Sequence, residues 1–154
     1  MKISQKGIDA IKYFEGFKSK AYLDVVGVPT IGYGSTIISG KRVALGSTIT
    51  LEDAEKALRE DVRAFESAVN SSIKVETTQN EFDALVCITY NIGIGGMRGS
   101  TFMRKHNDGD KEGCAEAMKM WCKGTVNGKK VTIQGLLNRR IMEGEIYLYS
   151  KYVG

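Results

Sequence analysis

The spacing of apolar residues changes twice along the chain, and this limits the fold to a small β part and a larger helical part. Apolar side chains recur at helical spacing from about Gln5 to Glu15. From Ala21 to Ile38, short β-branched and aromatic stretches alternate with glycines, which is typical of a small antiparallel sheet or hairpin. Beyond Thr48 the helical pattern returns. We therefore predict an α+β fold that is mainly α.

Capping residues mark where the later helices begin. Thr50 precedes an acidic first turn, and its helix should end near Val69. Thr78 and Glu81 form a T-x-x-E capping box for a strongly apolar helix that should end near Asn91. The remaining predicted helices are a short one after Ser100 and two more over Asp110–Trp121 and about Gly135–Tyr149.

The composition is that of a single globular domain. Of the 154 residues, 42% are hydrophobic and 26% are charged, and a chain of this length can bury a core without disulfides or metals. We expect one domain over residues 1–154, with a sheet lobe of about 15–48 and a helical lobe that joins about 50–154 to the N-terminal helix. The net charge of +4 favours approach to polyanions in general. Glycines interrupt the lysines between Lys123 and Lys130, so we expect a solvated loop there and no nucleic-acid binding.

The cysteines and the single histidine give no metal-binding pattern. Cys87, Cys114 and Cys122 have no CxxC spacing, so we expect reduced packing residues and no metal site. His106 lies in a polar segment and should be a solvated surface residue. The first residues have no signal-peptide pattern, and no apolar run reaches the roughly 18 residues of a membrane span. We therefore expect synthesis in a cytosol and no membrane insertion.

Two carboxylates nine residues apart are the best candidates for chemistry. Glu15 continues the apolar stripe of Ile8 and Ile11 at the end of the first helix, and Asp24 lies in the turn of the predicted hairpin. Burial disfavours a charged carboxyl, so Glu15 should stay protonated near neutrality while the better solvated Asp24 stays ionised. Glycoside hydrolysis requires such an acid and such a carboxylate. The spacing alone also fits an ordinary helix end and an ordinary turn.

A strand over residues 30–34 would place alternate side chains on opposite faces. Thr30 and Gly32 would share a face that is polar and nearly bare, with Ile31 and Tyr33 on the other face. A bare polar face suits the close approach of a ligand, so Gly32 is a candidate substrate-binding residue.

Ordered motifs extend over most of the chain. They are Glu15, Asp24 and Thr30 with the segment Pro29–Gly34, then Phe82–Leu85, Tyr90–Gly93, Gly99–Thr101, and Gly135–Arg140 with Glu143. This set resembles the motifs of the phage-type lysozymes, the endolysins of glycoside hydrolase family 24. The resemblance implies a lysozyme-like fold, in which a cleft separates the sheet lobe from the helical lobe.

The resemblance also implies the reaction. Members of this family cut the β-1,4 bond between N-acetylmuramic acid and N-acetylglucosamine in peptidoglycan, with inversion and without a cofactor, and so lyse the host cell. Glu15 would be the general acid, Asp24 would position or activate the attacking water, and Thr30 would hold that water through its hydroxyl. Inversion requires the two carboxyls to lie about 6.5 to 9.5 Å apart.

Further site residues follow from the same resemblance. Arg139 matches the family arginine that pairs with the catalytic glutamate, although Arg139 or Arg140 could instead form a surface ion pair with Glu143. Tyr90 and Asn91 would line the cleft, where an aromatic face and an amide suit N-acetyl sugars, but Tyr90 could equally be a core residue.

The chain departs from the family pattern at Ser35. Ser35 stands where many relatives have histidine, which puts a local salt bridge in doubt.

An endolysin made in the host cytoplasm would act as a monomer and would need a separate membrane-permeabilising protein to reach the wall or periplasm. A lytic transglycosylase and a non-catalytic wall-binding module are the alternatives, and Asp24 with Thr30 favours the hydrolase.

Overall fold

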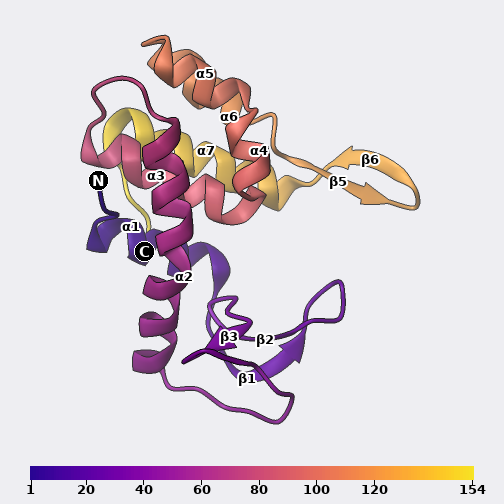
Figure 1. Ribbon diagram of the computed structural model, residues 1–154. Coiled ribbons are helices and arrows are strands. Elements are labelled where there is room, and N and C mark those ends of the chain that lie inside the picture. The colour runs from indigo at the N-terminus through magenta and orange to yellow at the C-terminus, as the bar shows by residue number, and fades with distance from the viewer. The chain divides into compact units, whose positions relative to one another are not determined.

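The computed structural model describes residues 1–154 and contains seven helices and three two-stranded antiparallel sheets (Figure 1). The helices are α1 (Gln5–Glu15), α2 (Leu51–Ser72), α3 (Gln79–Ile92), α4 (Ile94–Arg98), α5 (Thr101–Asn107), α6 (Lys111–Met118) and α7 (Gln134–Tyr149). The strands are β1 (Lys18–Leu23), β2 (Pro29–Gly32), β3 (Ile37–Ile38), β4 (Lys41–Arg42), β5 (Lys123–Val126) and β6 (Lys129–Thr132). The predicted mainly helical α+β class is confirmed.

The chain divides into two compact units. The sheet unit comprises Ile11–Ala64, and the helical unit comprises Met1–Ala10 with Phe65–Gly154. The boundaries fall inside α1 and α2, so each of these helices contributes to both units. No helix in either unit is long and apolar enough to cross a membrane.

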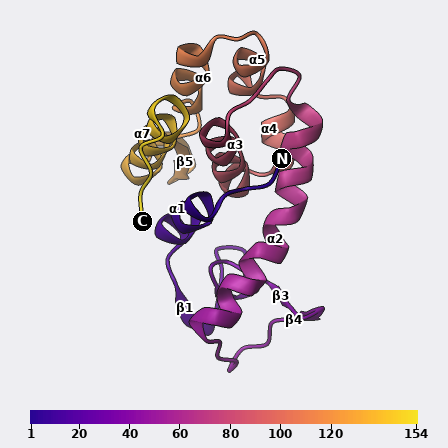
Figure 2. The same ribbon diagram turned by 90° about the vertical axis from the view of Figure 1, so that its left-hand side faces the viewer.

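The sheet unit is built from the C-terminal end of α1, two short hairpins and the N-terminal part of α2 (Figure 2). Strand β1 pairs with β2, which places Tyr22 opposite Thr30, and β3 pairs with β4. Ser39 and Gly40 join β3 to β4 with φ values of 49° and 79°, as a two-residue hairpin turn requires. Strand β2 ends at Gly32, so the predicted strand over residues 30–34 is two residues too long. The cause is a φ of 69° at Gly32, which is left-handed rather than extended backbone.

Side chains cap the starts of five helices, including those predicted to begin after Thr50, Thr78 and Ser100. The Ser4 hydroxyl accepts from the backbone N–H of Gly7 at 3.1 Å and begins α1. The Thr78 and Glu81 capping box begins α3, and the backbone and side chain of each residue take part. Caps also form at Thr50, Ser100 and Asp110, which begin α2, α5 and α6. These helix starts are therefore fixed by hydrogen bonds between residues close in sequence.

The core of the helical unit surrounds α3, whose residues 81–89 are all buried. Helix α3 packs along α7, and α6 contacts both α5 and α7. The three cysteines lie in this unit and are all buried and free, as expected of packing residues.

The segment that was expected to be a solvated loop is the hairpin β5–β6, and that prediction is wrong. Its four cross-strand pairs run from Lys123 opposite Thr132 to Val126 opposite Lys129. Asn127 and Gly128 form the turn with φ values of 51° and 77°. An Asn-Gly pair between short alternating stretches is a strong hairpin signal, and it could have revealed these strands. Figure 1 shows the hairpin projecting beyond the helices of its own unit.

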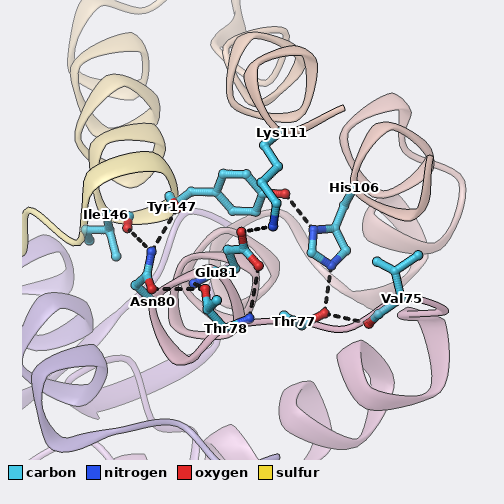
Figure 3. A network of polar contacts seen from close by, with 9 residues as sticks. All are labelled: Val75, Thr77, Thr78, Asn80, Glu81, His106, Lys111, Ile146 and Tyr147. Atoms are coloured by element: carbon cyan, nitrogen blue, oxygen red, sulfur yellow. Dashed lines mark hydrogen bonds and ion pairs between the residues drawn. The ribbon is translucent and has the colours of Figure 1, made fainter. Parts of the chain in front are cut away.

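The expectation for His106 is also wrong, because its side chain is only 1% exposed. Its Nδ1 lies 2.5 Å from the Tyr147 hydroxyl and its Nε2 lies 2.9 Å from the Thr77 hydroxyl (Figure 3). His106 lies three and four residues after the buried Met103 and Phe102, so it shares their face of α5. This helical spacing could have indicated that His106 is buried. The polar residues next to it in the sequence suggested a surface position instead.

Candidate active site

Glu15 is the last residue of α1 and is half-buried. Ile8 and Ile11, which precede it on the same stripe, are fully buried. Gly16 ends the helix with a φ of 72°, and its N–H donates to the Lys12 carbonyl at 2.9 Å. The helix end therefore fixes the backbone that carries the Glu15 carboxyl.

Lys12 braces this end of α1 within the sheet unit. Its ammonium forms an ion pair with Glu55 of α2 and lies 5.7 Å from the centre of the Tyr33 ring. Tyr33 is buried and packs against Phe17 at 5.6 Å between ring centres. The hydrogen bond from Lys12 lowers the pKa of Glu55, so this pair stays ionised well below neutral pH. The last turn of α1 is thus tied to α2 and to the residues that follow β2.

Asp24 lies in the turn that joins β1 to β2. Its carbonyl accepts from the Gly27 N–H at 3.0 Å, and Gly27 has a φ of 84°. The Asp24 Oδ1 atom accepts from the backbone N–H groups of Val26 at 2.9 Å and Val28 at 2.8 Å. Both of these side-chain bonds use Oδ1, so Oδ2 keeps its lone pairs for a ligand. Asp24 therefore shapes its own turn and still offers one carboxylate oxygen.

Thr30 is only 4% exposed, and its hydroxyl donates to the Val28 carbonyl at 2.9 Å. The same carbonyl accepts from the Asp24 N–H at 3.0 Å. Because a hydroxyl has a single hydrogen, the Thr30 oxygen can act toward a further partner only as an acceptor. Sequence reasoning missed Val28, whose backbone N–H and carbonyl bind Asp24 and Thr30. The D-x-x-G pattern over residues 24–27 was the signal for this turn.

Gly32 has a packing role that the sequence did not indicate. A Cβ atom at this position would lie 3.2 Å from the Cβ of Ala54 in α2. The strand face at Gly32, which was expected to be bare, is therefore covered by α2. The absent side chain allows the strand to approach the helix closely, and the positive φ is the second reason for glycine here.

Ser35, which stands where many relatives have histidine, forms a hydrogen bond in place of the salt bridge that was in doubt. Its side chain is 1% exposed, and its hydroxyl donates to Asp61 Oδ2 of α2 at 2.6 Å. Burial raises the pKa of Asp61, and the Ser35 hydrogen bond partly offsets this rise. A neutral donor thus satisfies a carboxylate that has no histidine partner.

Arg139 and Arg140 lie in the helical unit and share one carboxylate, that of Glu143. Arg139 Nε lies 3.1 Å from Glu143 Oε2, and Arg140 Nη1 bonds the other oxygen. Glu143 has no exposed surface, so the ion pair with Glu143, which was the alternative role for these arginines, is formed but is buried rather than on the surface. Arg139 also donates to the Cys87 carbonyl at 3.2 Å. These contacts hold both guanidinium groups in fixed orientations.

Tyr90 and Asn91 lie at the end of α3. Tyr90 is half-buried, and its ring meets Phe65 edge to face at 5.2 Å between ring centres. Asn91 is exposed, and its side-chain oxygen accepts from Arg140 Nη2. Because the Asn91 oxygen accepts this bond, its amide NH2 group is the part of the side chain that can donate a hydrogen bond to a ligand.

The sheet unit thus contains Glu15, Asp24 and Thr30, while Arg139, Tyr90 and Asn91 belong to the helical unit. In the hairpin turn, the side chains of Asp24 and Thr30 are both hydrogen-bonded to the backbone of Val28. No group of three or more His, Cys, Asp or Glu side chains is placed to hold a metal ion.

A mainly helical fold with a glutamate at the end of the first helix and an aspartate in the hairpin turn is that of a lysozyme-like glycoside hydrolase. The family model described as phage lysozyme matches residues 12–143. The chain therefore belongs to the phage lysozyme family, and as a lysozyme it is a hydrolase of bacterial peptidoglycan.

Individual relatives agree with this assignment over nearly the whole chain. The endolysin of Acyrthosiphon pisum secondary endosymbiont phage 1 is 40% identical over 147 residues, which are 96% of this chain and 98% of the relative. The solved endolysin from Escherichia coli O157:H7 phage FAHEc1 is 60% identical, with a TM-score of 0.95, and the match covers 100% of this chain and 98% of that one. A solved P22 lysozyme mutant is 38% identical, with a TM-score of 0.86 over 96% of this chain and 99% of its own.

Proposed function

We propose that this lysozyme cuts the β-1,4 bond between N-acetylmuramic acid and N-acetylglucosamine with inversion, and that Glu15 is its general acid. The observation that supports the proposal is that the side chains of Asp24 and Thr30 are both hydrogen-bonded to the backbone of one residue, Val28. This turn belongs to the same unit as Glu15. Such an arrangement supplies an acid and a separate water-binding pair, the two parts that an inverting glycosidase requires.

The hydrogen bonds of the turn support a specific orientation for the attacking water. Oδ2 of Asp24 accepts one hydrogen of the water, and the Thr30 oxygen accepts the other. Because Thr30 donates its own hydrogen to Val28, its oxygen can only accept from the water. A water that donates twice keeps a lone pair for the anomeric carbon. Its attack transfers one proton to Asp24 while Glu15 protonates the departing sugar oxygen.

Other residues support this reaction in the proposal. The family resemblance gives Arg139, which Glu143 holds, a role in support of the general acid, and it gives Tyr90 and the amide of Asn91 the N-acetyl sugars as ligands. Gly32 contributes by keeping the strand next to α2, in addition to any contact of its backbone with substrate. Inversion places the two carboxyls about 6.5 to 9.5 Å apart, so that a water fits between them. No cofactor takes part.

The biological role follows from the same proposal. The enzyme acts as a monomer on host peptidoglycan and thereby lyses the cell. It is made in the host cytoplasm and reaches the wall or periplasm only after a separate protein has permeabilised the membrane. Expression of the chain in bacteria with and without a membrane-permeabilising agent tests this dependence. Lysis without the agent would contradict it.

The mechanism is tested by digestion of purified peptidoglycan with wild type, Glu15→Gln and Asp24→Asn. Loss of a general acid should lower turnover by about 10²- to 10⁴-fold, and loss of the base by a similar factor. Glu76→Gln, an exposed change outside the site, is the control and should retain activity. Circular dichroism and thermal unfolding verify that each variant is folded.

The products separate this proposal from its alternatives. Reducing muramic acid ends whose initial anomer is inverted, as followed by NMR, support the hydrolase. Anhydromuramic ends would indicate a transglycosylase instead. Binding to the wall without cleavage would leave a wall-binding module, and full activity in Glu15→Gln would remove the assigned general acid.

A further inference from the structure

Asp83 lies in α3 with only 1% of its surface exposed, and the proposed reaction makes no use of it. Its Oδ1 atom accepts from the backbone N–H of Ser4 at 3.0 Å and from the side-chain amide of Gln79 at 2.8 Å. Its Oδ2 atom accepts from the hydroxyl of Ser4 and from the hydroxyl of Tyr152 at 2.6 Å. A carboxylate offers about four lone pairs, so these bonds occupy its acceptor positions. Asp83 is therefore placed to hold other residues, and we call these contacts the Asp83 anchor.

The Asp83 anchor fastens the start of α1 to α3. Two of its bonds come from Ser4, whose hydroxyl also caps α1 by accepting from the Gly7 N–H at 3.1 Å. The preceding residue, Ile3, donates its N–H to Glu66 Oε2 of α2 at 2.6 Å. A helix cap requires only the bond between Ser4 and Gly7. The other bonds therefore serve to place the first turn of α1 against two other helices.

Gly7 leaves room for Asp83 to approach α1 closely. A Cβ atom at this buried position would lie 2.9 Å from Asp83 Cγ and 2.5 Å from Ile3 Cγ1, which is too close for a real contact. Glycine in a helix interior is destabilising relative to alanine, so α1 loses helix stability at this position. The close packing of α1 on Asp83 is the physical reason for the glycine.

Tyr152 connects the segment after α7 to the Asp83 anchor. Its side chain is half-buried, and the Lys6 ammonium of α1 lies 5.6 Å from the centre of its ring. Burial and the hydrogen bond to Asp83 both raise the pKa of Tyr152. Its hydroxyl therefore stays protonated and remains a donor to Asp83 throughout the neutral range.

We propose that Asp83 is a positioning residue for the general acid and that it acts through α1. The inference rests on the proposed role of Glu15, which is the last residue of that helix. Helix α1 has 11 residues, which correspond to about 16 Å at 1.5 Å per residue. A change of tilt at its start is carried along this length to the Glu15 backbone. Because a displacement of about 1 Å can lower a rate by about 10²-fold, the start of α1 must be held firmly.

The Asp83 anchor acts at the opposite end of α1 from the ion pair of Lys12 and Glu55. That ion pair ties the last turn of α1 to α2. Asp83 ties the first turn to α3, whose own end carries Tyr90 and Asn91. Loss of the anchor displaces α1 and leaves those two residues on α3. We therefore expect slower proton transfer, measured as kcat, with little change in the binding of the sugars, measured as KM.

The test compares Tyr152→Phe and Asp83→Asn with wild type on soluble peptidoglycan fragments, well below the unfolding temperature of each protein. Asp83→Asn replaces an acceptor oxygen with an NH2 group and should lower kcat by up to about 10²-fold. Tyr152→Phe removes a single bond and should lower kcat about three- to ten-fold, as the net worth of one hydrogen bond predicts. KM should stay nearly constant in both variants. A wild-type kcat in both, or a change in KM alone, would overturn the proposal.

Two controls separate positioning from a loss of stability. Tyr149→Phe makes the same change at a tyrosine that is 72% exposed, and it should leave kcat and the unfolding temperature unchanged. Asp110→Ala removes the cap of α6, so it should lower the unfolding temperature and leave kcat at the wild-type value. If Asp110→Ala lowered kcat as much as Tyr152→Phe does, a general loss of stability would explain the effect and the proposal would fail.

A double-mutant cycle shows whether the effect passes through Glu15. In the Glu15→Gln background, Tyr152→Phe should lower the residual rate no further, because the group that the anchor positions is gone. The same fold-decrease in both backgrounds would overturn the proposal, since the anchor would then act independently of Glu15.

An NMR measurement separates failure of this inference from failure of the proposed function. The glutamate side-chain carboxyls are labelled with carbon-13, and the Glu15 signal is identified as the one that Glu15→Gln removes. Tyr152→Phe should shift this signal and Tyr149→Phe should not. Such a shift would support the positioning of Glu15 even if Glu15→Gln kept full activity. No shift, with Glu15→Gln inactive, would overturn the inference and leave the proposed function in place.

Discussion

Asp24 and Thr30 are both hydrogen-bonded to the backbone of Val28, Asp24 as acceptor from its N–H and Thr30 as donor to its carbonyl. A second bond, from the Asp24 N–H to the same carbonyl, closes the turn. Backbone geometry therefore sets the relative position of the two side chains. Neither side chain can move far without breaking the turn that carries it.

The first prediction concerns the Thr30 hydroxyl. Thr30→Val removes the acceptor for the attacking water and should lower kcat by about 10²-fold with little change in KM. Thr30→Ser keeps the hydroxyl and its bond to Val28, so it should recover most of the activity. Steady-state kinetics on soluble glycan measure both variants. A Thr30→Val enzyme with wild-type kcat would exclude Thr30 from water binding.

The second prediction concerns the hydrogen bond between Ser35 and Asp61. Ser35→Ala removes the donor from the half-buried carboxylate of Asp61 and should lower the free energy of unfolding by about 1–3 kcal/mol at pH 7. Thermal or urea unfolding measures this loss. An unchanged midpoint would show that water replaces the serine without cost.

The third prediction follows from the raised pKa of Asp61. A carboxyl whose folded pKa lies above its ordinary value of 3.8 contributes most stability at low pH and loses it as pH rises through the folded pKa. Asp61→Asn still accepts from Ser35 and does not ionise, so it should unfold at a higher temperature than wild type at pH 7. At pH 3, Asp61 is protonated in both the folded and the unfolded state, so the difference in unfolding temperature between Asp61→Asn and wild type should vanish. An equal advantage at both pH values would argue against a titration effect.

The fourth prediction concerns the buried His106. The Thr77 hydroxyl donates to the Val75 carbonyl at 3.0 Å, so it accepts from His106 Nε2, and Nδ1 accepts from Tyr147. Burial lowers the pKa of His106 below its ordinary value of 6.5, with nearby Glu81 opposing the shift and Lys111 adding to it. The neutral form is therefore favoured on folding, and stability is lost as pH falls from about 6.5 through the folded pKa.

A pH series on two proteins measures this effect. The unfolding temperature of wild type should fall more steeply between pH 7.5 and pH 5 than that of His106→Gln, which cannot titrate. The series ends at pH 5 because most carboxyl groups titrate below that value. Parallel curves for the two proteins would contradict the assignment.

The fifth prediction concerns the buried Glu143 and its two arginines. Glu143→Gln leaves Arg139 and Arg140 close together without a carboxylate between them and should cost about 3–5 kcal/mol of unfolding free energy. Glu145→Gln, in the same helix, breaks only an exposed ion pair with Lys151 and should change stability by less than about 1 kcal/mol. Urea unfolding compares the two variants. Similar losses of unfolding free energy in the two variants would mean that the burial of Glu143 does not determine the size of the loss.

Much of the helical pattern and two parts of the candidate site could be predicted from the sequence. Glu15 was placed at a helix end and Asp24 in a hairpin turn from apolar spacing and glycines alone. The hairpin β5–β6 could also have been predicted from Asn127-Gly128, but the glycines among its lysines were interpreted as a solvated loop. The assignment of a reaction to these residues came from the resemblance, since spacing alone also fitted ordinary structural roles.

The sequence by itself determined the features that depend on neighbours a few residues apart. These include the Thr78 capping box and the Asp24 turn, because their hydrogen bonds span four residues or fewer. Only the tertiary structure decided that His106 is buried and that Ser35 meets Asp61, 26 residues away. Contacts of this kind depend on how helices and strands pack, and packing brings together side chains whose sequence neighbours carry no sign of the partner.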